Sequence, residues 1–134
     1  MKNSIFALTL LLLVGALSTV RAQEKNFVIS TGNPDRVPAI IITANTLAEE
    51  HAGDLGEIQI VLYGKAVSNL DQTEPAKAWL DKVKDDKIEF RACNMALHKF
   101  DVDQKKLPKQ FEVVSNAFIY VLKLKEKGYY GLDL

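Results

Sequence analysis

Residues 58–64, IQIVLYG, decide the fold class of this chain. Apart from Gln59, the run from Ile58 to Tyr63 is apolar and rich in β-branched residues, which is typical of a buried strand in a parallel sheet. Gly64 ends the run at a turn. The stretch therefore predicts a buried parallel strand and, with it, an α/β fold.

Apolar runs on either side of this strand predict the rest of the sheet. We expect further strands at 27–29, 88–93 and 111–114, and an edge strand at 129–132. Apolar residues at helical spacing predict helices over 37–48, 73–83, 94–98 and 116–127. Thr73 and Asn94 are the expected N-caps of two of these helices, and Gly128 is the expected stop of the last. Strands and helices that alternate over short loops indicate a mainly parallel sheet covered on both faces.

The N-terminus has the layout of a secretory signal peptide. Lys2 precedes an apolar run from Ile5 to Leu17, and small residues lead up to Ala22. The run is shorter than the roughly 20 apolar residues that span a bilayer. We predict a signal peptide over residues 1–22, a single mature domain over residues 23–134, and export to the periplasm with no membrane association after cleavage.

Charge and cysteine content narrow the function classes. The chain has 17 basic and 17 acidic residues, interspersed along the sequence, so a nucleic-acid or anionic-membrane surface is not expected. Cys93 is the single cysteine, so no disulfide can form within the chain and the fold must rely on packing. Cys93 is then a buried small hydrophobe, an intermolecular link or a reactive thiol.

Open α/β folds place functional groups at the carboxyl ends of their strands. Cys93 ends the third predicted strand just before a helix start, where unpaired N–H groups favour an anion, so it is the candidate nucleophile. The alternative is a packed, inert thiol. Arg91 shares a sheet face with Cys93 and is a candidate to steady an anion, unless it is a surface cation. Asn94 and Gly64, at the ends of the third and second predicted strands, complete the predicted substrate-binding set.

Other chemistry receives less support from the sequence. Ser30 to Asn33 resembles a short phosphate-binding turn such as a flavin site uses, but an ordinary loop is the better interpretation, and we expect no cofactor. Cys93, His98 and His51 have no recognisable metal-ligand spacing, and we expect no metal. The final predicted helix is apolar over two adjacent lines of residues, which indicates a subunit interface as much as a deep core position.

Four segments together resemble the DsrE/DsrF-like sulfur-relay family: FRACNMAL at 90–97, LPKQFEVVSNAFIYVLKLKEKGY at 107–129, ITANTLAEE at 42–50 and IVLYGKAV at 60–67. The resemblance covers most of residues 27–131. It implies a flavodoxin-like three-layer sandwich with a sheet of about five strands, and assembly into trimers or hexamers. It also implies that Cys93 occupies the position at which relay members carry sulfur as a persulfide.

The resemblance leads to two functional hypotheses. The first is an exported, homo-oligomeric protein that binds or transfers sulfane sulfur through Cys93, with a sulfur donor or acceptor protein as its partner. Such a transfer proceeds by attack of a thiolate on sulfur, so it requires no base or metal. The alternative is a non-catalytic, oligomeric small-molecule or partner-binding module in which Cys93 is structural. Whether the protein is an enzyme stays open between these two.

Overall fold

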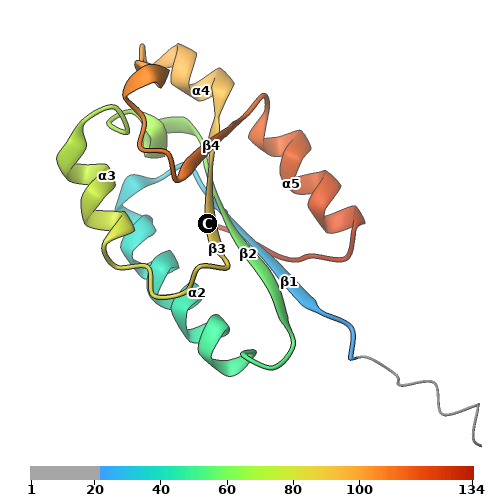
Figure 1. Ribbon diagram of the computed structural model, residues 1–134. Coiled ribbons are helices and arrows are strands. Elements are labelled where there is room, and N and C mark those ends of the chain that lie inside the picture. The colour runs from blue at the N-terminus through green and yellow to red at the C-terminus, as the bar shows by residue number, and fades with distance from the viewer. Residues whose placement is uncertain (1–21) are drawn as a thin grey trace, which may run out of the picture.

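The computed structural model describes residues 22–134, so the predicted signal peptide lies, except for Ala22, outside the described residues. Figure 1 shows one sheet flanked by helices. Its five strands are arranged in the order β4-β3-β2-β1-β5, and all four neighbouring pairs are parallel. The predicted α/β fold with a parallel sheet of five strands is therefore confirmed.

The elements follow one another in the alternation that the sequence predicts. The strands are β1 (Lys25–Thr31), β2 (Leu55–Leu62), β3 (Ile88–Cys93), β4 (Phe111–Val114) and β5 (Tyr130–Asp133). The helices are α2 (Val37–Glu50), α3 (Thr73–Leu80), α4 (Asn94–Lys99) and α5 (Ala117–Glu126). Short 3-10 turns occupy η1 (Pro34–Arg36), η2 (Gly64–Val67) and η3 (Gln104–Lys106). Every helix within residues 22–134 is too short or too polar to cross a membrane.

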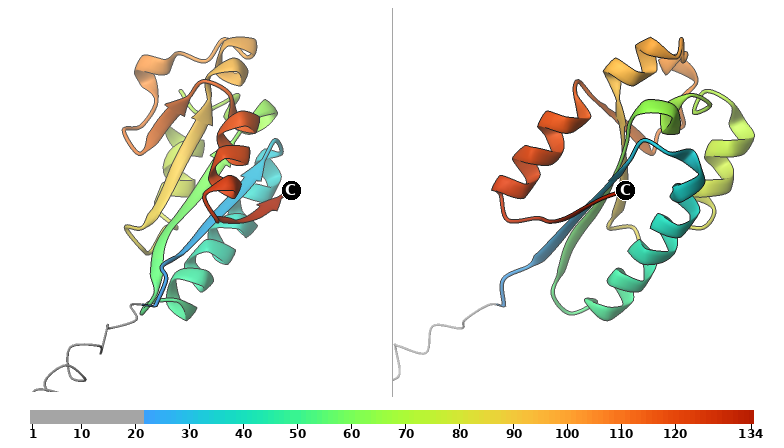
Figure 2. Two further views of the ribbon diagram at one scale, coloured as in Figure 1. Left: turned by 90° about the vertical axis from the view of Figure 1, so that its right-hand side faces the viewer. Right: turned by 180° about the vertical axis from the view of Figure 1, so that it is seen from behind.

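The two faces of the sheet are covered differently. Helices α2 and α3 cover one face, whereas α5 lies on the other (Figures 1 and 2). Ile58 and Ile60 of β2 are fully buried, and Gln59 between them bonds to a side chain of α5. Because side chains alternate along a strand, Ile58 and Ile60 face α2 and α3, whereas Gln59 faces α5.

Helix α3 departs from the sequence prediction at both ends. It ends at Leu80 rather than at residue 83, and Gln72 rather than Thr73 occupies its N-cap. The early end has a tertiary cause. The Asn45 side chain on α2 donates to the Lys82 carbonyl at 2.9 Å and accepts the Lys84 N–H at 3.0 Å. Both backbone groups are thus held in a loop conformation by a residue from another element.

The other expected elements lie within a few residues of their predicted bounds. Strand β4 spans the predicted residues, and α5 ends just before the expected stop at Gly128, whose φ of +94° favours glycine. The expected N-cap of α4, Asn94, is wrong by one residue. Cys93 occupies the cap position, and Asn94 is the first helical residue. Cys93 therefore belongs to the strand, as predicted, and also forms the start of α4.

Candidate functional site

Cys93 lies at the carboxyl end of β3 and is buried, with 6% of its surface exposed. Its side chain makes no capping bond to α4. Instead, Sγ accepts a hydrogen bond from the backbone N–H of Ala117 at 3.4 Å. Ala117 is the first residue of α5, so the sulfur contacts the start of a different helix from the one that the sequence indicates.

The backbone N–H groups at the start of α5 have two kinds of partner, the Asn116 side chain and Cys93 Sγ. Asn116 is the N-cap, and its Oδ1 accepts from the N–H groups of Phe118 at 3.0 Å and Ile119 at 3.4 Å. The Ala117 N–H is thereby left to point at Cys93 Sγ. An N–H donor and the positive end of a ten-residue helix both favour negative charge on the sulfur. The sulfur of Cys93 thus lies at the N-terminus of α5.

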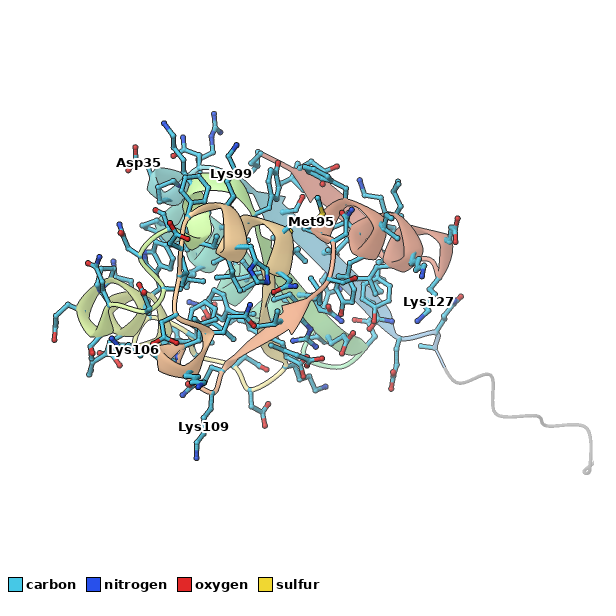
Figure 3. The ribbon with its side chains drawn as sticks, turned by 90° about the horizontal axis from the view of Figure 1, so that it is seen from above. Asp35, Met95, Lys99, Lys106, Lys109 and Lys127 are labelled. Carbon is cyan, nitrogen blue, oxygen red and sulfur yellow. The ribbon has the colours of Figure 1, made fainter. Side chains whose placement is uncertain are left out.

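Apolar side chains from α4 and from the end of β2 lie toward α5. Figure 3 looks down on the sheet from its α4 end and shows Met95, on α4, lying toward α5. Met95 is 61% exposed. Tyr63, which follows β2, packs edge-on against Phe118 of α5 with ring centroids 5.0 Å apart.

Arg91 shares the sheet face of Cys93, as predicted, but its guanidinium is engaged elsewhere. It forms a salt bridge with Glu89, and its Nη2 lies 3.6 Å from Glu112 Oε2. Its Nε donates to the Tyr120 hydroxyl at 3.2 Å. Burial lowers the pKa of Arg91, but the bonds to Glu89 and Tyr120 outweigh it and raise the pKa overall. The described hydrogen bonds and ion pairs of Arg91 are thus all to groups other than the sulfur.

The other two predicted binding residues have structural partners. Asn94 Oδ1 accepts from Gln104 Nε2 at 2.6 Å, which ties α4 to η3. Gly64 has a φ of +51°, and a Cβ there would lie 3.5 Å from the Gly32 carbonyl oxygen. Glycine suits this turn because the left-handed conformation is costly for other residues. None of the described hydrogen bonds connects either residue to Cys93.

The loop from Ser30 to Pro34 uses its polar groups internally. The Thr31 hydroxyl accepts the Asn33 N–H at 3.1 Å, and Asn33 Oδ1 accepts the Asp35 N–H at 3.0 Å. Two amides that a phosphate would need are thus already bonded, which fits the ordinary-loop interpretation. His51 follows α2 whereas His98 lies on α4, and residues 22–134 contain no cluster of three or more potential metal ligands.

The sequence did not predict the polar network that lies beneath α5. The Tyr120 hydroxyl donates to Gln59 Oε1 at 2.5 Å, and Gln59 Nε2 donates to Glu57 Oε1 at 2.6 Å. Tyr129 donates to the same Glu57, and burial together with this bond raises the pKa of Tyr129. The one available signal was Gln59, a polar residue within an apolar strand. The network fixes α5, and with it the Ala117 N–H, over the sheet.

Comparisons with known proteins identify the fold. No family model and no curated protein matches the chain. Among solved structures, it resembles a protein of unknown function, MTH1491, from Methanobacterium thermoautotrophicum. The TM-score is 0.68 at 18% identity, covering 84% of this chain and all of that one. It also resembles a conserved protein of unknown function, BT1422, from Bacteroides thetaiotaomicron. Here the TM-score is 0.64 at 17% identity, covering 82% and 95% of the two chains. The likeness is one of fold alone.

Proposed function

We propose that this is an exported DsrE-like protein that binds or transfers sulfane sulfur as a persulfide on Cys93. The observation that carries the proposal is the hydrogen bond from the Ala117 N–H, at the start of α5, to Cys93 Sγ. A thiolate is the nucleophile in sulfur exchange, and the N–H donor and the helix terminus both favour the thiolate. The proposal needs neither a general base nor a metal ion.

The transfer step is an exchange at sulfur. The Cys93 thiolate attacks the outer, sulfane sulfur of a donor persulfide R–S–SH. A bond forms between Sγ and that sulfur while the donor S–S bond breaks, and its electron pair leaves with R–S⁻. The product is Cys93–S–SH, with no net oxidation in the exchange. In the delivery step an acceptor thiolate attacks the outer sulfur of Cys93–S–SH, and the Cys93 thiolate leaves. The proposed partner is a sulfur donor or acceptor protein.

Intact-protein mass spectrometry after brief exposure to polysulfide tests this function. Folded residues 23–134 are expected to gain one sulfur that a thiol reductant removes, and to gain it faster than the urea-unfolded chain does. The Cys93→Ser variant serves as the matched control and is expected to gain none. If sulfur is added only after unfolding, then Cys93 is a packing residue and the sulfur-transfer proposal fails.

The alternative is a non-catalytic oligomeric module, and one observation favours its oligomeric part. Phe118, Ile119 and Leu122 on α5 are each more than half exposed. Contiguous exposed apolar side chains on a helix are typical of a protein contact. We propose assembly of identical copies through this surface of α5. Light scattering is expected to give a mass above that of one chain, and Ile119→Lys is expected to reduce it to the monomer.

A further inference from the structure

A cleft of about 290 Å³ separates α5 from the carboxyl ends of β1 and β5. Its walls are mainly apolar and come from Tyr63, Phe118, Val121 and Leu122. The Tyr63 ring lies close to Gly32, where a Cβ would be only 2.8 Å from the ring. The ring thus rests directly on the backbone of Gly32, with Phe118 edge-on against it. Glycine at position 32 is what allows this close approach.

The topology of the sheet marks the same place independently. From β1, the strands β2, β3 and β4 are added on one side, whereas β5 is added on the other. The strand order therefore reverses at β1, and α5 leads into β5 across the face opposite α2 (Figure 2). Open α/β sheets bind ligands beyond the carboxyl ends of their strands at this reversal point. Ser30 near the end of β1 and Asp133 at the end of β5 line the cleft there.

The polar end of the cleft is a hydrogen-bonded group of three side chains. The buried Ser30 hydroxyl donates to Asp133 Oδ1 at 2.5 Å, and Lys125 Nζ donates to Asp133 Oδ2 at 2.6 Å. The hydrogen bonds from Lys125 and Ser30 lower the pKa of Asp133, so its carboxylate is ionised at neutral pH. The Lys125 and Asp133 charges cancel, while the half-exposed carboxylate retains lone pairs for another donor.

We infer that this cleft binds a small, uncharged aromatic alcohol of the phenol class. The ring fits between the aromatic and aliphatic walls, and the hydroxyl donates to the Asp133 carboxylate. Because the polar end is neutral overall, it selects against a charged ligand. At about 30 Å³ for each water-sized group, the volume holds roughly ten non-hydrogen atoms. The cleft adjoins the sulfur-transfer site, because Ala117, whose N–H bonds to Cys93 Sγ, is part of its lining, but Cys93 itself does not line the cleft.

The test is a titration of residues 23–134 with 4-ethylphenol, followed in amide ¹H–¹⁵N spectra. Saturable shifts are expected at Ser30, Tyr63 and Phe118. Ethylbenzene, which lacks the hydroxyl, is expected to bind at least about tenfold more weakly, as the loss of a hydrogen bond to a charged group implies. Asp133→Asn is expected to reduce that preference, and Asp35→Asn, an exposed position outside the cleft lining, is expected to preserve it.

Three outcomes would overturn the inference. The first is equal affinity for 4-ethylphenol and ethylbenzene, and the second is shifts confined to residues away from the cleft. The third is that 4-ethylphenol does not bind and that copies of the protein self-associate through the cleft. A second copy of the chain would then be the occupant. The spectra also report whether each variant is folded. Because Cys93 takes no part in the readout, failure here leaves the sulfur-transfer proposal unaffected, and the converse also holds.

Discussion

Replacing Tyr120 with Phe removes one oxygen atom from the polar network beneath α5. The Tyr120 hydroxyl donates to Gln59 Oε1 and accepts from Arg91 Nε, and both partner residues are buried. Arg91 keeps its bonds to Glu89 and to the Phe90 carbonyl. Gln59 Oε1 loses its described donor. Stranding a buried polar atom costs about 1–3 kcal/mol, so we expect a loss of about 2 kcal/mol in the free energy of unfolding.

Equilibrium urea unfolding of residues 23–134 measures this loss. With an m value of about 2 kcal/mol/M, typical of a small domain, the midpoint is expected to fall by about 1 M while m is unchanged. Tyr130→Phe is the matched control, because Tyr130 is 61% exposed and its change is expected to be within about 0.5 kcal/mol. The double variant Gln59→Leu/Tyr120→Phe is expected to lose less than the sum of the single losses.

If Tyr120→Phe destabilises the protein no more than Tyr130→Phe, then the Tyr120 hydroxyl does not stabilise the fold through Gln59. If the double variant loses as much free energy of unfolding as the two single variants together, then Gln59 and Tyr120 do not share a stabilising bond.

Three further predictions concern single positions. Gly64→Ala is expected to destabilise the protein by about 1–2 kcal/mol, because the φ of Gly64 is +51°. Gly53→Ala is the control and is expected to be nearly neutral, because there is open space around Gly53. Similar free energies of unfolding for the two variants in urea would contradict this prediction. Asn116→Ala is expected to cost about 1 kcal/mol by removing the cap of α5, and also to slow persulfide formation on Cys93; an unchanged unfolding midpoint would count against the cap. The pKa of Asp133 is lowered from 3.8 by its bonds to Lys125 and Ser30, so the ionised group stabilises the fold above that value. This stability is expected to be lost as pH falls below 3.8, so a wild-type advantage over Asp133→Asn that persisted in acid would exclude the mechanism.

Local pattern was sufficient for the order and kind of the elements. The apolar run in β2, the periodicity of α2 and the start of α5 next to Asn116 depend on residues adjacent in sequence, and each matched its prediction closely. The end of α3 did not, because its backbone groups are taken by Asn45, which is 37 residues from Lys82. Helical periodicity carries no information about such a partner.

The candidate site likewise has one part that the sequence predicted and another that it did not. The position of Cys93 at a strand end before a helix start was determined by the sequence, because strand and helix propensities act over a few neighbouring residues. Only the tertiary structure decided which helix its sulfur meets, and that helix is α5, which begins 24 residues later. It likewise engaged Arg91 with acidic partners and formed the cleft from β1, β5 and α5. These outcomes depend on how separate elements pack, and the contacts between them cannot be read from residues considered in chain order.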